Sequence, residues 1–325
     1  MCRSFLGRWE DENGNEVHDG RNNMGVVSIN LPRIGIRCGG DVATFWEMLD
    51  EQLEIAHDAL RHRIKRFETV QAKSAPILYT EGALGVKMHP DDYVIDLFRN
   101  GRASISLGYI GINETVNAIF DDGVPVFESE TKQELGQQIV KYLADACSDW
   151  KAAEGWGYSL YSTPSESLCN RFCELDSKRY GIIENVTDKD YYTNSFHLDV
   201  TFKTDPYSKI RFEENFPPLA SGGFINYVEL PDMSRNMWAL EDIWDYAYKH
   251  VGYFGLNMPV DQCFCCDFHG DFSCTNKGFT CPKCGNRDDS KMNVIRRVSG
   301  YLSAPNARPF NKGKQSEVMK RVKHM

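Results

Sequence analysis

Cysteine is the residue type with the clearest capacity for chemistry in this 325-residue chain. Two Cys-x-x-Cys pairs enclose residues 267–280, and a sharp change in composition near Pro259 precedes them. Each pair lets two thiolates reach one ion from a tight turn, and two pairs complete the tetrahedral shell that structural Zn²⁺ prefers. The spacing therefore predicts a zinc ribbon whose metal ligands are Cys263, Cys266, Cys281 and Cys284.

Four thiolates leave no open coordination position for water or substrate, so we expect this zinc to support the fold rather than to catalyse a reaction. An iron–sulfur cluster is an alternative occupant of the four-cysteine site, and reduced thiols without any metal are another. Cys265 and Cys274 lie outside the paired spacing. We expect both to be spectators, with Cys265 able to replace a neighbouring ligand.

A glycine in the C-terminal tail is the second candidate for chemistry. The run RRVSGYL at residues 296–302 follows the cysteine pairs, and residues 307–314 read ARPFNKGK. A carbon-centred backbone radical needs a planar Cα conjugated with the flanking amide and carbonyl, and only glycine leaves that plane free of a side chain. Taken alone, however, Gly300 is better interpreted as an ordinary turn glycine.

These tail segments closely resemble the radical loop of the anaerobic (class III) ribonucleoside-triphosphate reductases. Gly300 falls on the glycine that stores the radical in that family. The resemblance covers nearly the whole chain, through the segments RNNMG at 21–25, SISLGYIG at 104–111, YSTPSE at 161–166 and YTNSFH at 192–197. It reverses the interpretation of Gly300 as a turn residue.

The resemblance also implies roles for three other residues. Cys2, in the segment CRSFL at 2–6, corresponds to the finger-loop cysteine that becomes a transient thiyl radical and abstracts hydrogen from the substrate ribose. A sulfur radical suits this step because its S–H bond is comparable in strength to the C–H bond that it attacks.

Asn23 corresponds to an active-site amide near substrate or formate, and Glu166 to a candidate catalytic carboxylate. An amide can both donate to and accept from a ribose hydroxyl, and a carboxylate can accept a proton as water leaves. The alternative for both residues is a structural polar side chain with satisfied hydrogen bonds.

Apolar patterns indicate the elements that must position these residues. Apolar side chains at spacings of three and four predict helices over 45–67, 135–150 and 240–251. Strands are predicted at 27–31, 77–79, 104–110, 195–202 and 222–230, and an extended loop over 2–23. Long helices that alternate with short apolar strands predict an α/β layer or barrel with a largely buried sheet.

The resemblance makes this α/β fold class more specific. It implies the second half of a ten-stranded α/β barrel of the glycyl radical type, closed by a C-terminal zinc ribbon and a radical loop. We therefore expect three parts: the C-terminal half of the catalytic barrel with its finger loop at 1–258, the zinc ribbon at 259–291, and the glycyl radical loop and tail at 292–325.

Charge and hydropathy argue against several classes of protein. The net charge of −9 and the pI near 5.5 disfavour a protein that grips nucleic acid, which needs a basic face. Basic residues gather in the final segment, where a solvated tail is a simpler interpretation than a phosphate or partner contact. No apolar run is long enough to span a membrane and no signal-peptide pattern opens the chain, so we expect a cytoplasmic protein.

The activity that the resemblance implies is anaerobic reduction of ribonucleoside triphosphates to 2′-deoxyribonucleoside triphosphates, with formate as reductant. A separate activase that uses S-adenosylmethionine and an iron–sulfur cluster would install the radical on Gly300, and the complete enzyme is expected to be a homodimer. Family members also carry an N-terminal portion with a regulatory cone, a specificity site, the first half of the barrel and a second active-site cysteine. We expect this chain to be a split-gene product or a truncation that needs that half.

Two other functions are compatible with the sequence. The first is a glycyl radical lyase that acts on an acyl or diol substrate, although the cysteine pairs before the radical loop argue against it. The second is a catalytically silent fragment that serves as a zinc-ribbon assembly or activase-docking module. Co-purification with a complementary N-terminal chain would distinguish this fragment from a reductase.

Overall fold

The computed structural model describes residues 14–17, 20–99, 101–165, 167–275, 277–298, 301–304 and 310–325. Three residues that the sequence singles out, Cys2, Glu166 and Gly300, lie outside these ranges. No helix within the described ranges is long and apolar enough to cross a membrane.

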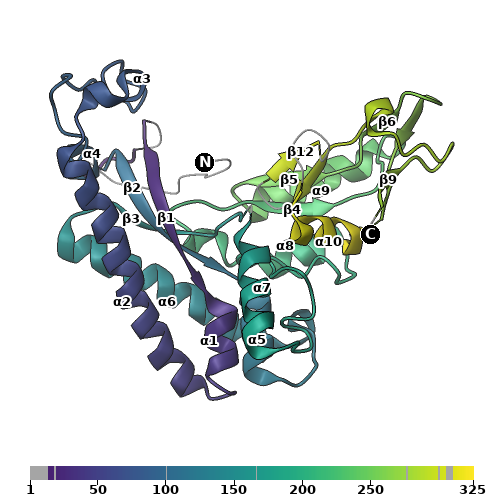
Figure 1. The fold of residues 1–325 in the computed structure, drawn as a ribbon, viewed down its shortest axis with the longest axis horizontal. Coiled ribbons are helices and arrows are strands. Elements are labelled where there is room, and N and C mark those ends of the chain that lie inside the picture. The colour runs from purple at the N-terminus through teal and green to yellow at the C-terminus, as the bar shows by residue number, and fades with distance from the viewer. Residues whose placement is uncertain are drawn as a thin grey trace.

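A parallel sheet forms the centre of the N-terminal lobe. Strand β1 (Asn22–Asn30) pairs with β2 (Ala103–Ile110), and β2 pairs with β3 (Tyr158–Tyr161), in each case in parallel. Every residue of β2 is buried, as expected for the central strand of a parallel sheet. The long helices α2 (Val42–Lys65) and α6 (Glu130–Glu154) pack against this sheet (Figure 1).

Helix α2 begins where the sequence supplies a cap. The side chain of Asp41 accepts hydrogen bonds from the amides of Ala43 and Thr44, which have no partner inside the helix. The buried residues of α2 then recur at spacings of three and four: Phe45, Leu49, Leu53, Ala56, Leu60 and Ile64. The predicted helices over 45–67 and 135–150 are thereby confirmed as α2 and α6, and the third as α9 (Met237–His250).

Two more parallel strands continue the architecture. Strand β4 (Asn226–Glu229) pairs with β5 (Phe254–Asn257), and α9 is the crossover helix that connects them. A parallel bridge between Tyr161 and Gly223 joins the end of β3 to the segment that enters β4. The parallel sheets β1–β2–β3 and β4–β5 are therefore linked by this bridge, and together with the covering helices and the antiparallel strands that follow they confirm a mixed α/β fold.

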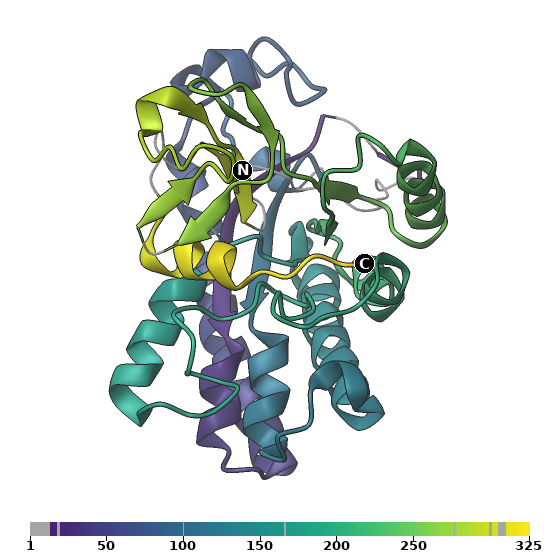
Figure 2. The same ribbon diagram turned by 90° about the vertical axis from the view of Figure 1, so that its right-hand side faces the viewer.

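The C-terminal part consists of short antiparallel strands. Strands β6 (Asp261–Cys263), β7 (Phe268–Gly270) and β10 (Met292–Asn293) form one small sheet, and β8 (Ser273–Thr275) pairs with β9 (Gly278–Thr280). They enclose a separate small core. A hairpin of β11 (Arg296–Val298) and β12 (Tyr301–Ser303) follows, and then α10 (Lys312–Lys320). Figure 2 shows α10 and the last residues running across the molecule below these strands.

Shorter elements complete the described chain. They are α1 (Leu31–Arg37), η1 (Arg66–Thr69), η2 (Ala72–Ser74), α3 (Pro76–Tyr79), α4 (Asp96–Arg99), α5 (Ile112–Phe120), η3 (Val126–Glu128), α7 (Leu168–Tyr180), α8 (Pro206–Glu213), η4 (Pro217–Leu219) and η5 (Asp289–Lys291).

Three of the strand predictions need correction. The strand predicted at 77–79 is wrong, because these residues lie in the short helix α3, which starts at Pro76. The strand predicted at 195–202 is also wrong: residues 195–198 are buried, but the segment folds as turns and irregular backbone, beginning with a positive φ of 39° at Ser195. Only 226–229 of the strand predicted at 222–230 is regular.

Candidate metal centre and polar sheet face

Two matching turns present the four cysteines of the ribbon. The amide of Asp267 donates to the carbonyl of Cys263, and the amide of Gly285 donates to the carbonyl of Cys281, both at 2.9 Å. Asp267 and Gly285 both adopt a positive φ, 54° and 71°, which closes each turn directly after its second cysteine. Each Cys-x-x-Cys pair is thus folded into a turn that directs both thiols towards one point.

The four sulfur atoms meet at that point. Sγ of Cys263 lies 3.6 Å from Sγ of Cys284, and Sγ of Cys266 lies 3.7 Å from Sγ of Cys281. All four lie within 4.8 Å of one another. Zn–S bonds of about 2.3 Å in a tetrahedron separate the sulfurs by about 3.8 Å, whereas a disulfide needs about 2.05 Å. The cluster therefore fits one metal ion, and its members are the four residues predicted from the spacing.

Hydrogen-bond donors around Cys263 favour a thiolate at that position. Burial raises the pKa of the Cys263 thiol, but hydrogen bonds from the backbone of Cys265 and Cys266, with two neighbouring side chains, outweigh it and lower the pKa to about 6. One of these side chains is Asn286, whose Nδ2 lies 3.6 Å from Sγ of Cys263. Such donors stabilise the deprotonated form that metal binding requires.

The remaining cysteines of the ribbon stand apart from this cluster. Cys265 is exposed and Cys274 is half-buried, and neither belongs to the group whose ligand atoms converge. The structure thus places Cys266 in the cluster and leaves Cys265 and Cys274 outside it.

A row of small polar side chains lines one face of the parallel sheet. Asn23 of β1 is only 6% exposed, and its Nδ2 donates to Oγ of Ser106 on β2. Oγ of Ser106 in turn lies 2.8 Å from Oγ of Ser159 on β3. Oδ1 of Asn23 accepts from the amide of Gly25 at 3.1 Å. An amide and two hydroxyls therefore form one hydrogen-bonded row across three strands.

The backbone at Gly222 also packs closely against this polar row. A Cβ at Gly222 would lie 2.7 Å from Oγ of Ser159 and 2.8 Å from Oγ of Ser106, so the chain approaches the row as closely as glycine allows. Buried strands of parallel sheets are usually apolar, and residues alternate between the two faces. The alternation of serine with isoleucine and leucine at residues 104–107 was the signal that marks this face, and our sequence interpretation did not use it.

The substitution Gly108→Ala should destabilise the protein. A Cβ at Gly108 would collide with Oγ1 of Thr163 and lie 2.5 Å from Oγ of Ser28. Overpacking of this kind costs about 1–3 kcal/mol, which urea unfolding followed by circular dichroism would measure. Gly255→Ala in β5 is the matched control, because its Cβ would meet nothing closer than 3.9 Å. An equal loss of stability in both variants would contradict the close approach at Gly108.

The segments next to Glu166 and Gly300, two site candidates outside the described residues, meet at a small cavity. Ser165, which precedes Glu166, and Val298, two residues before Gly300, both line this cavity together with Asn194. Oδ1 of Asn194 accepts from the amide of Ser165 at 2.9 Å. The fold thus brings residues beside both candidates to one place, while Glu166 and Gly300 themselves lie outside the described residues, as does Cys2.

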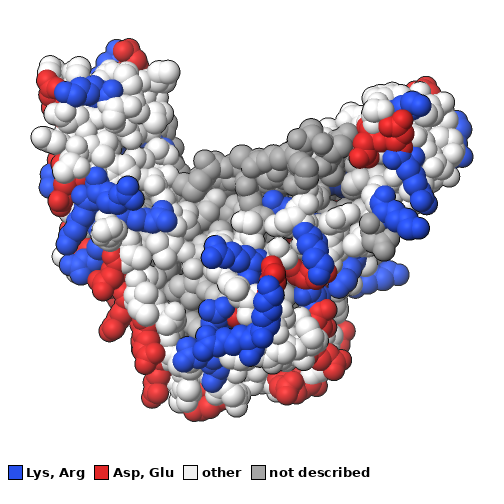
Figure 3. Space-filling view, viewed as in Figure 1, with Lys and Arg blue, Asp and Glu red and all other residues white. Residues whose placement is uncertain are grey.

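Charged side chains on the visible face of the molecule gather in patches. Figure 3 shows lysine and arginine over the region of α1 and α7 as well as near the C-terminal segment.

One ion pair connects α1 with α7. Nε of Arg33 in α1 lies 2.6 Å from Oδ1 of the fully buried Asp176 in α7. Arg33 therefore joins these two helices by an ion pair.

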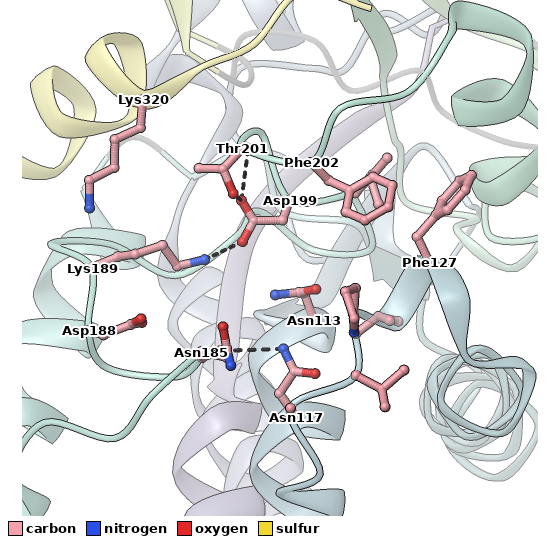
Figure 4. Close-up of a pocket in the computed structure, with 15 residues that line it drawn as sticks. Asn113, Asn117, Phe127, Asn185, Asp188, Lys189, Asp199, Thr201, Phe202 and Lys320 are labelled. Carbon is pink, nitrogen blue, oxygen red and sulfur yellow. Dashed lines mark hydrogen bonds and ion pairs between the residues drawn. The ribbon is translucent and has the colours of Figure 1, made fainter.

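A larger cavity of about 310 Å³ lies between α5, η3 and the loop that follows α7. Figure 4 shows Lys189 directed at Asp199 on one side of this cavity, and Phe127 and Phe202 on the other. Nζ of Lys189 also lies 3.0 Å from Oε1 of the buried Glu114, so its charge is neutralised within the protein. Among the site residues predicted from the sequence that the structure describes, neither Asn23 nor the four paired cysteines line this cavity.

Comparison with known proteins identifies the family. A family model described as "Anaerobic ribonucleoside-triphosphate reductase" matches residues 1–324. The chain belongs to this family. The family resemblance found in the sequence is thereby confirmed, and the match includes the cysteine cluster, Asn23 and the tail.

Relatives in the anaerobic ribonucleoside-triphosphate reductase family are close in sequence but longer. The chain is 60% identical over 324 residues to the protein of that name from Escherichia coli (strain K12). This alignment covers 100% of this chain and 45% of the relative. It is 48% identical over 327 residues to the protein from Enterobacteria phage T4, which covers 99% of this chain and 52% of the relative. The chain therefore spans about half the length of the curated relatives that it matches.

Solved structures of anaerobic ribonucleotide reductases resemble the fold. One described as "Anaerobic ribonucleotide reductase" gives a TM-score of 0.69 at 20% identity, over 98% of this chain and 47% of that chain. The Thermotoga maritima anaerobic ribonucleotide reductase with glycerol in the active site gives 0.64 at 20% identity, over 97% of this chain and 46% of that chain. At this identity the likeness concerns the fold, and it agrees with the mixed α/β architecture.

Proposed function

We propose that this chain is the C-terminal catalytic part of an anaerobic reductase that converts ribonucleoside triphosphates to 2′-deoxyribonucleoside triphosphates. The observation that carries the proposal is the family match over residues 1–324, with 60% identity to a relative named for this reaction. The matched length contains the finger-loop candidate Cys2, the buried amide Asn23 and the tail glycine Gly300 in the expected order.

The order of the described strands supports the proposed half-barrel at 1–258. Strands β1, β2 and β3 form one parallel sheet and β4 and β5 another, and the parallel bridge between Tyr161 and Gly223 links the two, which leaves β1 and β5 at the outer ends. Within the described ranges, each of these end strands pairs with one neighbour only. Both edges can therefore accept strands from a complementary half, which would close a ten-stranded barrel.

The family match over residues 1–324 also supports the two C-terminal parts, the ribbon and the tail. The ribbon at 259–291 carries the cysteine cluster, and we propose Zn²⁺ as its ion because four thiolates at these distances form a closed tetrahedral shell. The tail at 292–325 carries the hairpin and α10.

The proposed chemistry divides between the radical and the side chains around it. The radical stored at Gly300 would take the hydrogen atom of the Cys2 thiol, forming the glycine Cα–H bond as the S–H bond breaks. The resulting Cys2 thiyl radical would then take a hydrogen atom from the ribose, forming an S–H bond as the C–H bond breaks. Formate then supplies two electrons and is oxidised to carbon dioxide, while the 2′-hydroxyl leaves as water.

We assign supporting roles to two polar residues. Asn23, already held by Ser106 and Gly25, presents an amide that can bind a ribose hydroxyl or formate. Glu166 is the proposed acceptor of a hydroxyl proton. A site enclosed by the complementary half would exclude water and oxygen from the radical.

The proposed partners follow from the family. They are an activase that uses S-adenosylmethionine and an iron–sulfur cluster, the complementary N-terminal half, and a second copy of the complete enzyme as a homodimer. No role in nucleic-acid or membrane binding is proposed.

An anaerobic turnover assay tests the function. The chain would be combined with an N-terminal portion from a relative, the activase, S-adenosylmethionine, a reductant and ¹⁴C-formate, and then given a ribonucleoside triphosphate. We expect equal amounts of deoxyribonucleotide and labelled carbon dioxide. Asn23→Ala should lower kcat by about 10²-fold, the order of effect of losing a group that positions the substrate.

Asn293→Ala, at an exposed position of β10, is the control for this assay and should leave kcat unchanged. Product formed without formate would contradict the assigned reductant. Activase-dependent radical without any product would instead favour the silent docking fragment.

A further inference from the structure

The guanidinium of Arg321, directly after α10, connects three elements. Nη1 lies 3.0 Å from Oε1 of Glu229 at the end of β4, and Nη2 lies 2.7 Å from Oε1 of Glu317 on α10. Nη1 also donates to the carbonyl of Arg297 in β11 at 2.5 Å. One side chain thus joins the sheet, the last helix and the hairpin.

This junction is buried and depends on the shape of arginine. The side chains of Arg321, Glu229 and Glu317 are at most 7% exposed. Burial raises the pKa of the Glu317 carboxyl, and the neighbouring Arg321 opposes that rise. Because a planar guanidinium presents several N–H groups in fixed directions, it can reach three acceptors at once, whereas a lysine ammonium is a compact point charge. Removal of one partner would leave a buried charge without compensation.

The backbone beyond Arg321 is attached to the same strand. The amide of His324 donates to the carbonyl of Glu229 at 2.7 Å, and the amide of Glu229 donates to Nδ1 of His324 at 2.9 Å. The amide of Val322 donates to the carbonyl of Val200 at 2.9 Å. The last residues of the chain are therefore hydrogen-bonded to β4 and to the segment around Val200 (Figure 2).

A second arginine attaches the hairpin to the ribbon. Arg296, the first residue of β11, pairs through both Nη atoms with the fully buried Asp261 of β6. Its Nη2 also lies 3.2 Å from Oδ1 of Asp271, and its guanidinium lies 5.0 Å from the centre of the Phe279 ring. The hairpin is thus held to the ribbon by Arg296 and to the sheet by Arg321.

We propose that Arg321 is a positioning residue for the radical, which fixes the hairpin β11–β12 against the end of β4. Ser299 and Gly300 stand between the paired Val298 and Tyr301 in the sequence, so anchoring of these two paired residues would bear on the chemistry assigned to Gly300. Hydrogen-atom transfer depends steeply on separation, and a displacement near 1 Å costs about 10²-fold in rate. This inference rests on the proposed role of Gly300; Arg321 itself touches no reacting atom.

Hydrogen–deuterium exchange of the zinc-loaded chain tests, without any radical, whether Arg321 holds the hairpin against β4. Arg321→Lys and Arg321→Gln should each accelerate exchange of the hairpin amides at 296–304 by at least about tenfold, because their anchor to β4 is lost. Exchange in the ribbon peptide at 261–291 should not change, because Arg296 and the cysteine cluster remain. Arg33→Lys is the matched control, since Arg33 pairs with a buried aspartate between α1 and α7. It should leave the hairpin unchanged.

A second measurement tests whether the contact of Arg321 with the hairpin affects the reaction. In the activated protein with its complementary half, Arg321→Gln should retain the radical signal, lower kcat by about 10²-fold and leave KM unchanged. Unchanged hairpin exchange in both Arg321 variants would overturn the proposal, and so would equal acceleration in the ribbon, which indicates general destabilisation. If the parent chain forms no radical, the proposed function fails while the exchange result still decides whether Arg321 holds the hairpin.

Discussion

Cys281→Ser should release the metal ion and unfold the ribbon while the parallel sheet stays folded. The ribbon has a small core of its own, formed by Cys263, Phe272, Phe279, Cys281, Met292 and Val294. Two of these residues are themselves metal ligands in our assignment, so the core depends on the ion. In small zinc domains the binding free energy of about 10–16 kcal/mol is also folding free energy, which makes this the largest stability effect that we expect.

Metal analysis and limited proteolysis measure this result. The parent chain, purified without oxygen, should contain one zinc ion, and Cys281→Ser should contain almost none and be cleaved within 261–291. Cys265→Ser is the matched control, because Cys265 is exposed and lies outside the cluster. Stoichiometric metal retained by Cys281→Ser, or metal lost from Cys265→Ser, would contradict the ligand assignment.

Gly300→Ala should abolish turnover completely while leaving the fold and the zinc content intact. Alanine places a methyl group on the carbon that must become planar and conjugated with its neighbouring amide and carbonyl, and the activase would meet that group instead of the second hydrogen. Turnover in the reconstituted assay should fall below detection. Ser299→Ala, at the adjacent position, is the control and should retain both radical and turnover. Substantial activity in Gly300→Ala would place the radical elsewhere.

Local patterns in the sequence were sufficient for part of the fold. Helix α2 was predictable because its buried residues recur at helical spacing and Asp41 caps its first turn. The strand prediction at 77–79 failed for a local reason, because Pro76 starts a helical turn there. The segment at 195–202 is apolar enough for a strand, but it folds as turns and irregular backbone from Ser195, which no periodicity reveals.

The same contrast between local and long-range information applies to the candidate sites. The cysteine cluster was predictable because each Cys-x-x-Cys pair lies within one turn. The row of Asn23, Ser106 and Ser159 was not, because its members meet only when β1, β2 and β3 pair in order. The contact of Arg321 with Glu229 likewise joins residues far apart in the chain. Gly300 and Cys2 were identified by family resemblance, and their roles remain predictions.

Electron paramagnetic resonance of the activated protein tests the central claim, a radical on Gly300, most directly. The chain would be activated without oxygen in the presence of its complementary half, once with ordinary glycine and once with glycine deuterated at Cα. One remaining α-hydrogen splits the signal of a glycyl radical into two lines, and deuterium couples far more weakly. We therefore predict a doublet from the ordinary protein that collapses to a single line after deuteration. No signal, or a signal that deuterated glycine does not alter, would contradict the account.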